Sequence, residues 1–588
     1  MSESTGAPPA PASPPSRDAS QDMSESTDGA PARPPARDAP QAGSESAGTT
    51  ERGPPARSVS QAKSESAGTI KASPPSRSAP QDMSESAGTI EASLPSRARH
   101  ASQDMSGSTG YAPESPPARD APQAMSESAG TLEAGSPSPA RPAPRDMSEG
   151  AELAAPSRRS RLLRALLAPV DAAGLHAFRL AFGLLMFAGT VRFAARGWIH
   201  QLYVEPTYHF HYWGFDWLEP LPAPGMVAVF VALGALSLLV AAGAWVRPAI
   251  ALFFVLFTYV ELLDKATYLN HYYFVSVVAL LMIALPLQRG VAVAPTWALW
   301  AVRLQVGLVY FYAGVAKLRP DWLLHAQPLK LWLAARADFP LIGPLLRRPE
   351  TAHAMSWAGA AFDLSVPFLL LHRRTRPFAY AGVLAFHGLT GALFPAIGMF
   401  PWLMAAAALV FFPPDWPRRL WHRLSPRTCP AAPVLSNTSF PARPLLLAAL
   451  ALHFAVQLAL PLRRLAYPGD TAWTEEGYRF AWQVMLVEKV GSVGYRVRDP
   501  VSGRERQVDP EPLLTAQQAK QMAFQPDMIL EYAHHLAAGS PGAEVRADVF
   551  VTYNGRPAAR LVDPDVDLAR ERDGLGPKSW ILPVPPRP

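Results

Sequence analysis

The chain has 588 residues and a formal net charge of +6, and its mean hydropathy of +0.03 averages three unlike regions. Its single cysteine, Cys429, excludes an intramolecular disulfide. The arginines stand beside hydrophobic segments, which favours membrane topology over a nucleic-acid-binding surface. No nucleic-acid partner is therefore predicted.

Residues 1–156 repeat a unit of roughly 20 residues, a length that is also found in solenoid repeats. The unit opens with Met-Ser-Glu-Ser and is clearest at Met1, Met23, Met83 and Met125. Because the units hold almost no large apolar residues, stacking them would bury no core. The arm is therefore predicted to be disordered, and it lacks the apolar stretch of a secretory signal.

Hydrophobic runs of membrane-spanning size begin at Gly174 and recur with short interruptions. They predict a mainly α-helical, polytopic membrane helix bundle of about nine spans, within residues 157–464. The runs lie near 174–193, 225–243, 247–263, 271–287, 297–316, 356–371, 377–395, 397–412 and 444–460.

Arginines orient these runs, because short cytoplasmic loops are enriched in Lys and Arg. They precede the first run and follow alternate runs, at Arg158, Arg159, Arg161, Arg164, Arg247, Arg289, Arg373, Arg374, Arg376, Arg418, Arg419 and Arg423. The pattern predicts a multi-pass protein with a cytoplasmic N-terminal arm. An odd number of spans then puts the C-terminal region outside the cytoplasm. The segment 317–355 carries cations on the predicted outer side and is expected to be a partly embedded loop.

Lys317 and His271 lie on the same predicted outer face, each at the end of a hydrophobic run. Desolvation disfavours the charged form of a lysine there, which would suit a general base. A lysine that snorkels to the interface is the simpler alternative. His271, beside Asn270, either polarises a ligand oxygen or is an interfacial histidine. Asp264 and Lys265 are expected to form a local ion pair at a helix end.

Asp363 and His387 fall within the sixth and seventh runs, so each is predicted to face a cavity or a partner. The chain lacks the zinc-protease motif, paired-cysteine motifs, a phosphate-binding glycine loop and a nucleophile elbow. No metal site is therefore predicted. Inverted repeats, which would favour a transporter, are also not recognisable.

Residues 465–588 predict a small α+β domain outside the membrane. Alternating residues indicate strands at 494–498 and 545–553, and residues 515–538 are predicted to form a helix. Asn554-Gly555 predicts a turn after the second strand. A domain of this size is expected to need the membrane part beside it for stability.

A series of segments resembles, in the same order along the chain, segments of one known family. These are Phe178-Arg179-Leu-Ala-Phe-Gly183, Tyr212-Trp-Gly214-Phe215, Leu263-Asp264-Lys265, Asn270-His271, Tyr310-Phe-Tyr312-Ala-Gly314-Val-Ala-Lys317, Asp363-Leu-Ser365, Phe386-His387, Ile397-Gly398-Met399-Phe400, Asp415-Trp416-Pro417, Trp473-Thr-Glu-Glu-Gly477-Tyr478-Arg-Phe-Ala-Trp482 and Asn554-Gly-Arg556. Together they resemble the vitamin K-dependent gamma-carboxylases and their bacterial relatives with the HTTM membrane domain. That likeness implies a bacterial-type inner membrane.

The resemblance implies roles for several residues. Lys317 takes the place of the family's lysine that deprotonates reduced vitamin K, and His271 would contact the quinol or the alkoxide formed from it. Asn270, His387 and Tyr312 would bind the cofactor, which is reduced vitamin K, menaquinol or a similar quinol. Oxygen and carbon dioxide would be co-substrates.

The segment with Trp473, Tyr478 and Trp482 is implied as the contact for the substrate glutamate. The implied activity is oxygenation of a quinol to its epoxide, with or without carboxylation of glutamate on an exported protein. The implied partners are membrane lipid, a quinone and that exported protein. The alternative is a non-catalytic quinone- or lipid-binding membrane protein, such as a sensor or an assembly factor.

This chain differs from the animal enzymes at two places. It has Leu269-Asn270-His271 where those enzymes have Asn-Asn-His, and Ala316-Lys317 where they have Lys-Lys. The second amide and one lysine of the animal enzymes are therefore missing from this chain.

Overall fold

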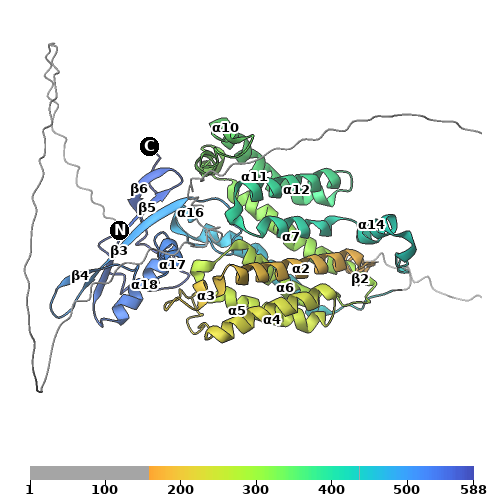
Figure 1. The fold of residues 1–588 in the computed structure, drawn as a ribbon, viewed down its shortest axis with the longest axis horizontal. Coiled ribbons are helices and arrows are strands. Elements are labelled where there is room, and N and C mark those ends of the chain that lie inside the picture. Colours follow the sequence, from red (N-terminus) through yellow and green to blue (C-terminus); the bar gives the residue numbers. More distant parts are fainter. Residues whose placement is uncertain (1–157, 436–437, 588) are drawn as a thin grey trace, which may run out of the picture. The chain divides into compact units, whose positions relative to one another are not determined.

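The computed structural model describes residues 158–435 and 438–587, and these are mainly helical, as predicted (Figure 1). The predicted disordered repeats at 1–156 lie outside the described residues. The predicted domain boundaries at residues 157 and 465 stay predictions.

Each of the predicted hydrophobic runs contains a helix. These helices are α2 (Ala173–Ala195), α4 (Ala223–Ala242), α5 (Val246–Leu262), α6 (Asn270–Ala284), α7 (Thr296–Lys317), α11 (Pro349–Leu371), α12 (Arg376–Leu393), α13 (Phe400–Ala407) and α15 (Pro444–Leu462).

The prediction of about nine spans is not confirmed, because only five described helices are long and apolar enough to cross a membrane. They are α2, α4, α7, α11 and the helix Pro444–Ala466 that contains α15. Among the others, α6 and α13 are clearly shorter than their apolar runs. Helix α6 has 15 residues, because Leu285 adopts an extended backbone before Pro286. Helix α13 has 8 residues and passes into the 3-10 turn η3 (Ala408–Phe411).

Glycines bring the helices of the bundle close together. A Cβ added to Gly183 of α2 would lie 2.6 Å from the carbonyl oxygen of Ser237 in α4. A Cβ added to Gly314 of α7 would lie 2.8 Å from the backbone nitrogen of Leu364 in α11. Such close backbone approach is typical of helix pairs in membranes.

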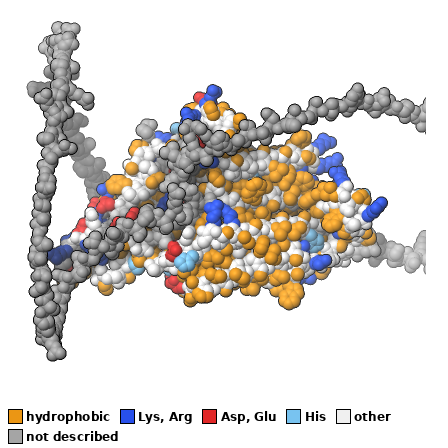
Figure 2. Space-filling view, viewed as in Figure 1, with side chains coloured by type: hydrophobic (Ala, Val, Ile, Leu, Met, Phe, Trp, Pro, Cys, Tyr) orange, Lys and Arg blue, Asp and Glu red, His pale blue; other side chains and the backbone are white. Residues whose placement is uncertain are grey.

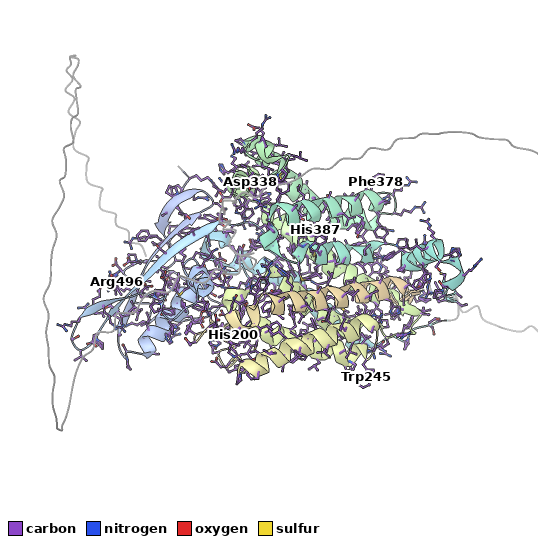
Figure 3. The ribbon with its side chains drawn as sticks, in the orientation of Figure 1. His200, Trp245, Asp338, Phe378, His387 and Arg496 are labelled. Carbon is purple, nitrogen blue, oxygen red and sulfur yellow. The ribbon has the colours of Figure 1, made fainter. Side chains whose placement is uncertain are left out.

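The outer surface of the helical region is strongly hydrophobic. Figure 2 shows hydrophobic side chains over most of the helical surface in view, with Lys and Arg gathered at the end where Figure 1 draws α14 (Trp416–Leu424). Trp245 and Phe378 are 82% and 80% exposed and point away from the bundle (Figure 3). A surface of this kind suits contact with lipid and supports a multi-pass membrane protein.

Short elements connect the long helices. They are α1 (Arg158–Leu167), α3 (Trp198–Tyr203), η1 (Lys265–Thr267), α8 (Pro320–Leu323), α9 (Leu329–Ala334), α10 (Gly343–Leu346), η2 (Pro395–Ile397), η4 (Pro426–Thr428) and η5 (Arg463–Ala466), with a ribbon of β1 (Pro169–Asp171) and β2 (Val293–Pro295). Helices α8 to α10 lie in the segment that was predicted to be a partly embedded loop.

The C-terminal part contains a four-stranded antiparallel sheet in the order β4-β3-β5-β6. Its strands are β3 (Lys489–Arg498), β4 (Glu505–Val508), β5 (Glu544–Tyr553) and β6 (Arg556–Arg560), and the short helix α16 (Thr471–Thr474) precedes them. Asn554 and Gly555 both have positive φ and join β5 to β6, so the predicted turn is confirmed.

The predicted single helix over 515–538 is wrong in its middle, where the chain breaks into α17 (Ala516–Met522) and α18 (Pro526–Ala538). Gln525 is extended because Pro526 follows it. Thr515 and Gln518 form a capping box that starts α17.

Lys265 does not pair with Asp264, contrary to the sequence prediction. Its Nζ lies 2.7 Å from Glu531 and 3.3 Å from Asp527, both in α18. Asp264 instead accepts hydrogen bonds from the backbone of Ala266 and from Gln518 of α17. Asp264 and Lys265, which follow α5 directly, therefore bind partners more than 250 residues away, and these contacts join the C-terminal end of α5 to α17 and α18.

A hydrogen bond also joins the segment after α7 to the residue that precedes the sheet strand β3. The indole nitrogen of Trp332 in α9 donates to the carboxylate of Glu488 at 2.5 Å. Burial raises the pKa of Glu488 to about 7, although the Trp332 hydrogen bond opposes that shift.

Glu488→Gln is expected to stabilise the protein at pH 8 and not at pH 4. The folded-state pKa of Glu488 is raised above its unfolded value of about 4.3, so ionisation costs folding free energy that grows from about pH 4 and is full above pH 7. We expect a gain on the order of 1–3 kcal/mol at pH 8, measured by thermal unfolding at both pH values. The exposed Glu511→Gln is the control. Equal gains at the two pH values would contradict the assignment.

Candidate functional site

Lys317 is the last residue of α7, and its ammonium group is buried between α7 and α11. Its Nζ lies 2.8 Å from Oδ2 of Asp363 and 3.4 Å from the carbonyl oxygen of Ala313. Lys317 and Asp363 are only 5% and 4% exposed. The Nζ also lies 5.3 Å from the ring centroid of Trp322. Since single charges at this depth are costly, each side chain is the compensating partner of the other.

The close packing of α7 and α11 sets this geometry. Gly314 precedes Lys317 by three residues, and Leu364, which Gly314 faces, directly follows Asp363. Because a side chain at position 314 would collide with the α11 backbone, the glycine lets the two helices approach until the ion pair can form.

The pair lines a cavity of about 80 Å³ with apolar and aromatic walls. His387 of α12 reaches the same cavity and lies between the helices (Figure 3). Its Nε2 shares a hydrogen bond of 2.8 Å with the hydroxyl of Tyr310. The remaining walls include Trp322, Leu329, Met355, Phe386, Phe394, Ile397, Phe400 and Met404.

The segment after α16 also reaches this cavity, through Val484 and Met485. Phe480, Trp482 and Met485 all have positive φ, which is uncommon for large side chains. Three such residues within six positions are a strained segment held in place by its packing. Sequence reasoning missed Val484 and Met485, because nothing in an apolar pair indicates contact with helices that lie far earlier in the chain.

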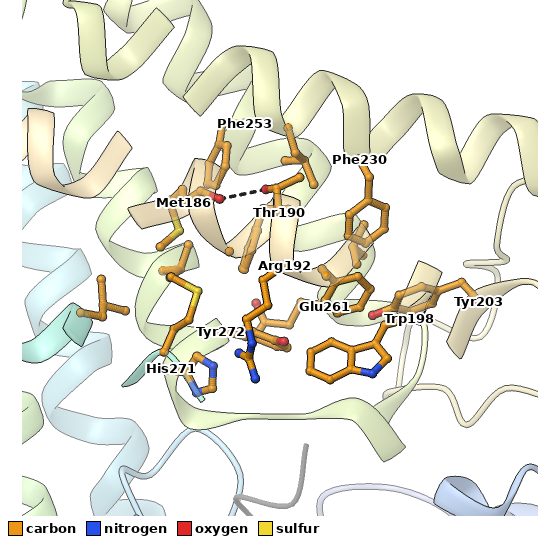
Figure 4. Close-up of a pocket in the computed structure, with 18 residues that line it drawn as sticks. Met186, Thr190, Arg192, Trp198, Tyr203, Phe230, Phe253, Glu261, His271 and Tyr272 are labelled. Carbon is orange, nitrogen blue, oxygen red and sulfur yellow. Dashed lines mark hydrogen bonds between the residues drawn. The ribbon is translucent and has the colours of Figure 1, made fainter. Parts of the chain in front are cut away.

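His271 lies elsewhere. It lines a second cavity of about 90 Å³, together with Arg192, Glu261 and Tyr272 (Figure 4). No described residue lines both cavities. Phe400 stands between them, with its ring centroid 6.1 Å from that of His271 and 6.1 Å from that of His387.

Asn270 and Tyr312 make structural hydrogen bonds. Asn270 donates to the carbonyl oxygen of Gln483 at 3.1 Å and accepts from the hydroxyl of Tyr268. The hydroxyl of Tyr312 donates to the carbonyl oxygen of Leu458 in α15. Helical periodicity would have favoured Tyr310 over Tyr312, because Tyr310 lies seven residues before Lys317 and so shares its face.

Trp473, Tyr478 and Trp482 are all buried, at 0%, 2% and 0% exposure. The indole nitrogen of Trp473 donates to the carbonyl oxygen of Leu582. The ring of Trp482 packs 4.9 Å from that of Tyr273 in α6. The three aromatic residues are therefore core residues in this conformation, and Trp482 anchors the strained segment on the helices.

The sequence indicated Lys317 and Asp363 separately but did not pair them. Both are isolated ionisable residues in apolar runs, and their opposite charges were the available signal. Among the described residues, no group of three or more His, Cys, Asp or Glu side chains is arranged to hold a metal ion. What the first cavity offers chemically is a buried ion pair beside apolar walls.

Two family models match the chain. Residues 167–416 match the HTTM domain, and residues 442–587 match the vitamin K-dependent gamma-carboxylase, lumenal domain. No solved structure matches the chain. The first match contains both cavities' polar residues, and the second contains the strained segment.

Gly314→Ala is expected to destabilise the protein by roughly 1–3 kcal/mol, because the new Cβ forces α7 and α11 apart and stretches the Lys317–Asp363 contact. Thermal unfolding in detergent measures the change. Gly307→Ala on the same helix is the matched control, since its Cβ would meet only Pro367, at an ordinary 3.7 Å. Equal Tm values for the two variants would show that the close approach of α7 and α11 at Gly314 does not contribute to stability.

Proposed function

Given that the chain belongs to the vitamin K-dependent gamma-carboxylase family, we propose that this membrane protein oxygenates a reduced quinone to its epoxide, with Lys317 as the base. The single observation that carries the proposal is the Lys317–Asp363 pair, buried in an apolar cavity at 2.8 Å. A quinone with an isoprenoid tail would reach such a cavity from the membrane.

The residues of the first cavity fit a quinol. Its aromatic and aliphatic walls suit a flat, apolar ring, and its polar atoms come from Lys317, Asp363, His387 and Tyr310. When bound, a reduced quinone supplies an acidic hydroxyl group and the electrons that reduce molecular oxygen.

Lys317 and Asp363 would handle the proton of that hydroxyl. With the shared proton on Asp363, Nζ of Lys317 keeps a lone pair and can accept a proton. The transfer within the pair does not change the net charge of the cavity, so it avoids the cost of a new isolated charge in an apolar site. The indole ring of Trp322 stabilises the ammonium form.

His387 and Tyr310 would orient the bound ring. Their mutual hydrogen bond fixes the imidazole on one face of the cavity. The apolar walls exclude bulk water, which would protect a reactive oxygenated species from hydrolysis. In this proposal Tyr312 has no contact with the ring.

Carboxylation of glutamate is the second part of the proposal. Val484 and Met485 connect the cavity to the part of the chain that matches the lumenal domain. A glutamate side chain of an exported protein would enter along this segment, and carbon dioxide would meet it there. Since Trp473, Tyr478 and Trp482 are buried, they would contact that glutamate only after the segment opens.

Replacement of Lys317 by methionine is expected to lower quinol epoxidation by about 10²–10⁴-fold, the usual contribution of a general base. Epoxide is measured after membranes are incubated with vitamin K hydroquinone and oxygen. Lys330→Met, a half-buried lysine in α9, is the control and should keep full activity.

Lys317→Met also leaves the Asp363 carboxylate buried without a cation, which costs about 3–5 kcal/mol of stability. The double variant Lys317→Met/Asp363→Leu removes both charges and is expected to recover the Tm but no epoxidation. Wild-type epoxidation in the folded double variant would refute the proposal and favour a non-catalytic quinone-binding protein.

Labelled bicarbonate separates the two parts of the proposed reaction. Wild-type membranes with vitamin K hydroquinone, oxygen and a glutamate-containing peptide are expected to produce epoxide and labelled peptide together. Epoxide without label would limit the activity to oxygenation. Label that persists in Lys317→Met would contradict the role of Lys317 in both steps.

A further inference from the structure

Helix α14 carries an apolar stripe that no protein element covers. Leu420, Trp421 and Leu424 are 47%, 54% and 78% exposed. They lie on one face of the helix, because residues three and four positions apart are neighbours on its surface. Arg419 and Arg423 are exposed beside this stripe, and α14 has no buried residue. A basic helix with an exposed apolar face is typical of helices that lie in a membrane surface.

Two contacts fix α14 at the end of the bundle where α2 begins. The carbonyl oxygen of Pro414, just before α14, accepts a hydrogen bond of 2.7 Å from the backbone nitrogen of Gly174 in α2. The Nε of Arg418 donates to Oδ2 of Asp171 in β1 at 2.8 Å. Helix α2 is long and apolar enough to cross a membrane, so its first residues lie at the level of the bilayer surface. These contacts therefore hold α14 at that level.

The cations of α14 exceed the carboxylates near them. Asp415 is occupied by Arg419, whose Nε donates to its Oδ2 at 2.6 Å. Arg423, and Arg427 in η4, form no ion pair with the residues that the structure describes. Figure 2 shows Lys and Arg side chains gathered at this end of the helical region. The surface is therefore complementary to anions.

Helix α1 adds to the same surface. Its side chains Arg158, Arg161 and Arg164 are exposed, and Leu162 is 62% exposed. The chain passes from α1 directly into β1, whose last residue Asp171 binds Arg418 of α14. The two helices are therefore joined through β1, and both present arginines together with exposed leucine.

The partner must satisfy the arginines and the apolar stripe together. A soluble anion would neutralise the arginines but leave Leu420, Trp421 and Leu424 in water. A lipid without net charge would cover the stripe but leave the positive charges uncompensated. An anionic phospholipid does both, because its headgroup carries the charge and its acyl chains are apolar. The lipid-facing surface of the bundle begins directly beside α14, which favours lipid over an acidic protein.

We propose that α1 and α14 bind anionic phospholipid. The headgroup pairs with Arg423 and Arg427, and the acyl chains cover Leu420, Trp421 and Leu424. None of these residues lines either cavity. The proposal therefore does not depend on the chemistry proposed for Lys317.

The first test asks whether the apolar stripe lies in lipid. Because Cys429 is the only cysteine, a Cys429→Ser background accepts a single nitroxide label at Leu424→Cys, or at Val501→Cys as the control. Val501 is 94% exposed in the C-terminal part. In phosphatidylglycerol nanodiscs, we expect the label at position 424 to collide mainly with oxygen, which dissolves in lipid, and the label at position 501 mainly with a water-soluble nickel chelate. A label at position 424 that collides mainly with nickel would overturn the proposal.

The second test measures the preference for charge. Native mass spectrometry of the full-length protein in detergent compares phosphatidylglycerol with phosphatidylcholine of the same acyl chains. We expect phosphatidylglycerol to bind about fivefold more tightly, the effect of one arginine near a charged lipid surface. Arg423→Gln/Arg427→Gln should lose most of this preference. Arg504→Gln/Arg506→Gln removes the same charge from exposed positions at β4 and should keep it.

Three outcomes of the second test would refute the proposal. Equal affinities of the wild-type protein for the two lipids would show that the arginines do not select charge. An unchanged preference in Arg423→Gln/Arg427→Gln would place the lipid elsewhere. An equal loss in Arg504→Gln/Arg506→Gln would attribute the preference to net charge alone.

Discussion

Burying a charge inside a membrane protein is costly, and one ion pair meets that cost between α7 and α11. Lys317 and Asp363 neutralise each other within an apolar bundle, which neither could enter alone without a large penalty. The pair requires two backbones at close range, and Gly314 makes that range accessible. The placement of the two charged side chains, the packing of α7 against α11 and the proposed proton chemistry therefore all depend on the contact between Lys317 and Asp363. The Lys317–Asp363 ion pair gives the adjacent cavity polar groups without giving it a net charge.

The two cavities differ in how fully their polar groups are satisfied. In the first, the charged groups and His387 have partners within the protein. In the second, Glu261 keeps one oxygen without a partner among the described residues. The start of helix α13 separates the two spaces, because Met399 and Leu403 face the second cavity, whereas the residues that directly follow them, Phe400 and Met404, face the first. The helical bundle thus contains two chemically distinct cavities.

Hydropathy located the helices because burial in lipid depends mainly on composition. It could not locate their ends, which follow from local features such as Pro286 after α6. Lys317 was identifiable from its place at the end of an aromatic run, and Tyr310 could have been chosen by periodicity. The separation of His271 from Lys317 was not predictable, because Phe400 comes between them only through the folding of α13. The ion pairs of Lys265 with Asp527 and Glu531 were not predictable either, because these residues meet only when the chain folds.

The Lys317–Asp363 pair also bears on how the chain is inserted during synthesis. Asp363 lies well inside α11, where a lone acidic residue opposes insertion by about 2.5–3.5 kcal/mol. Translation makes α7 before α11, so Lys317 has already been synthesised when Asp363 emerges from the ribosome. At usual rates the interval between the two residues is on the order of a few seconds. The order of the two charges along the gene therefore lets the second helix enter lipid with its counter-ion in place.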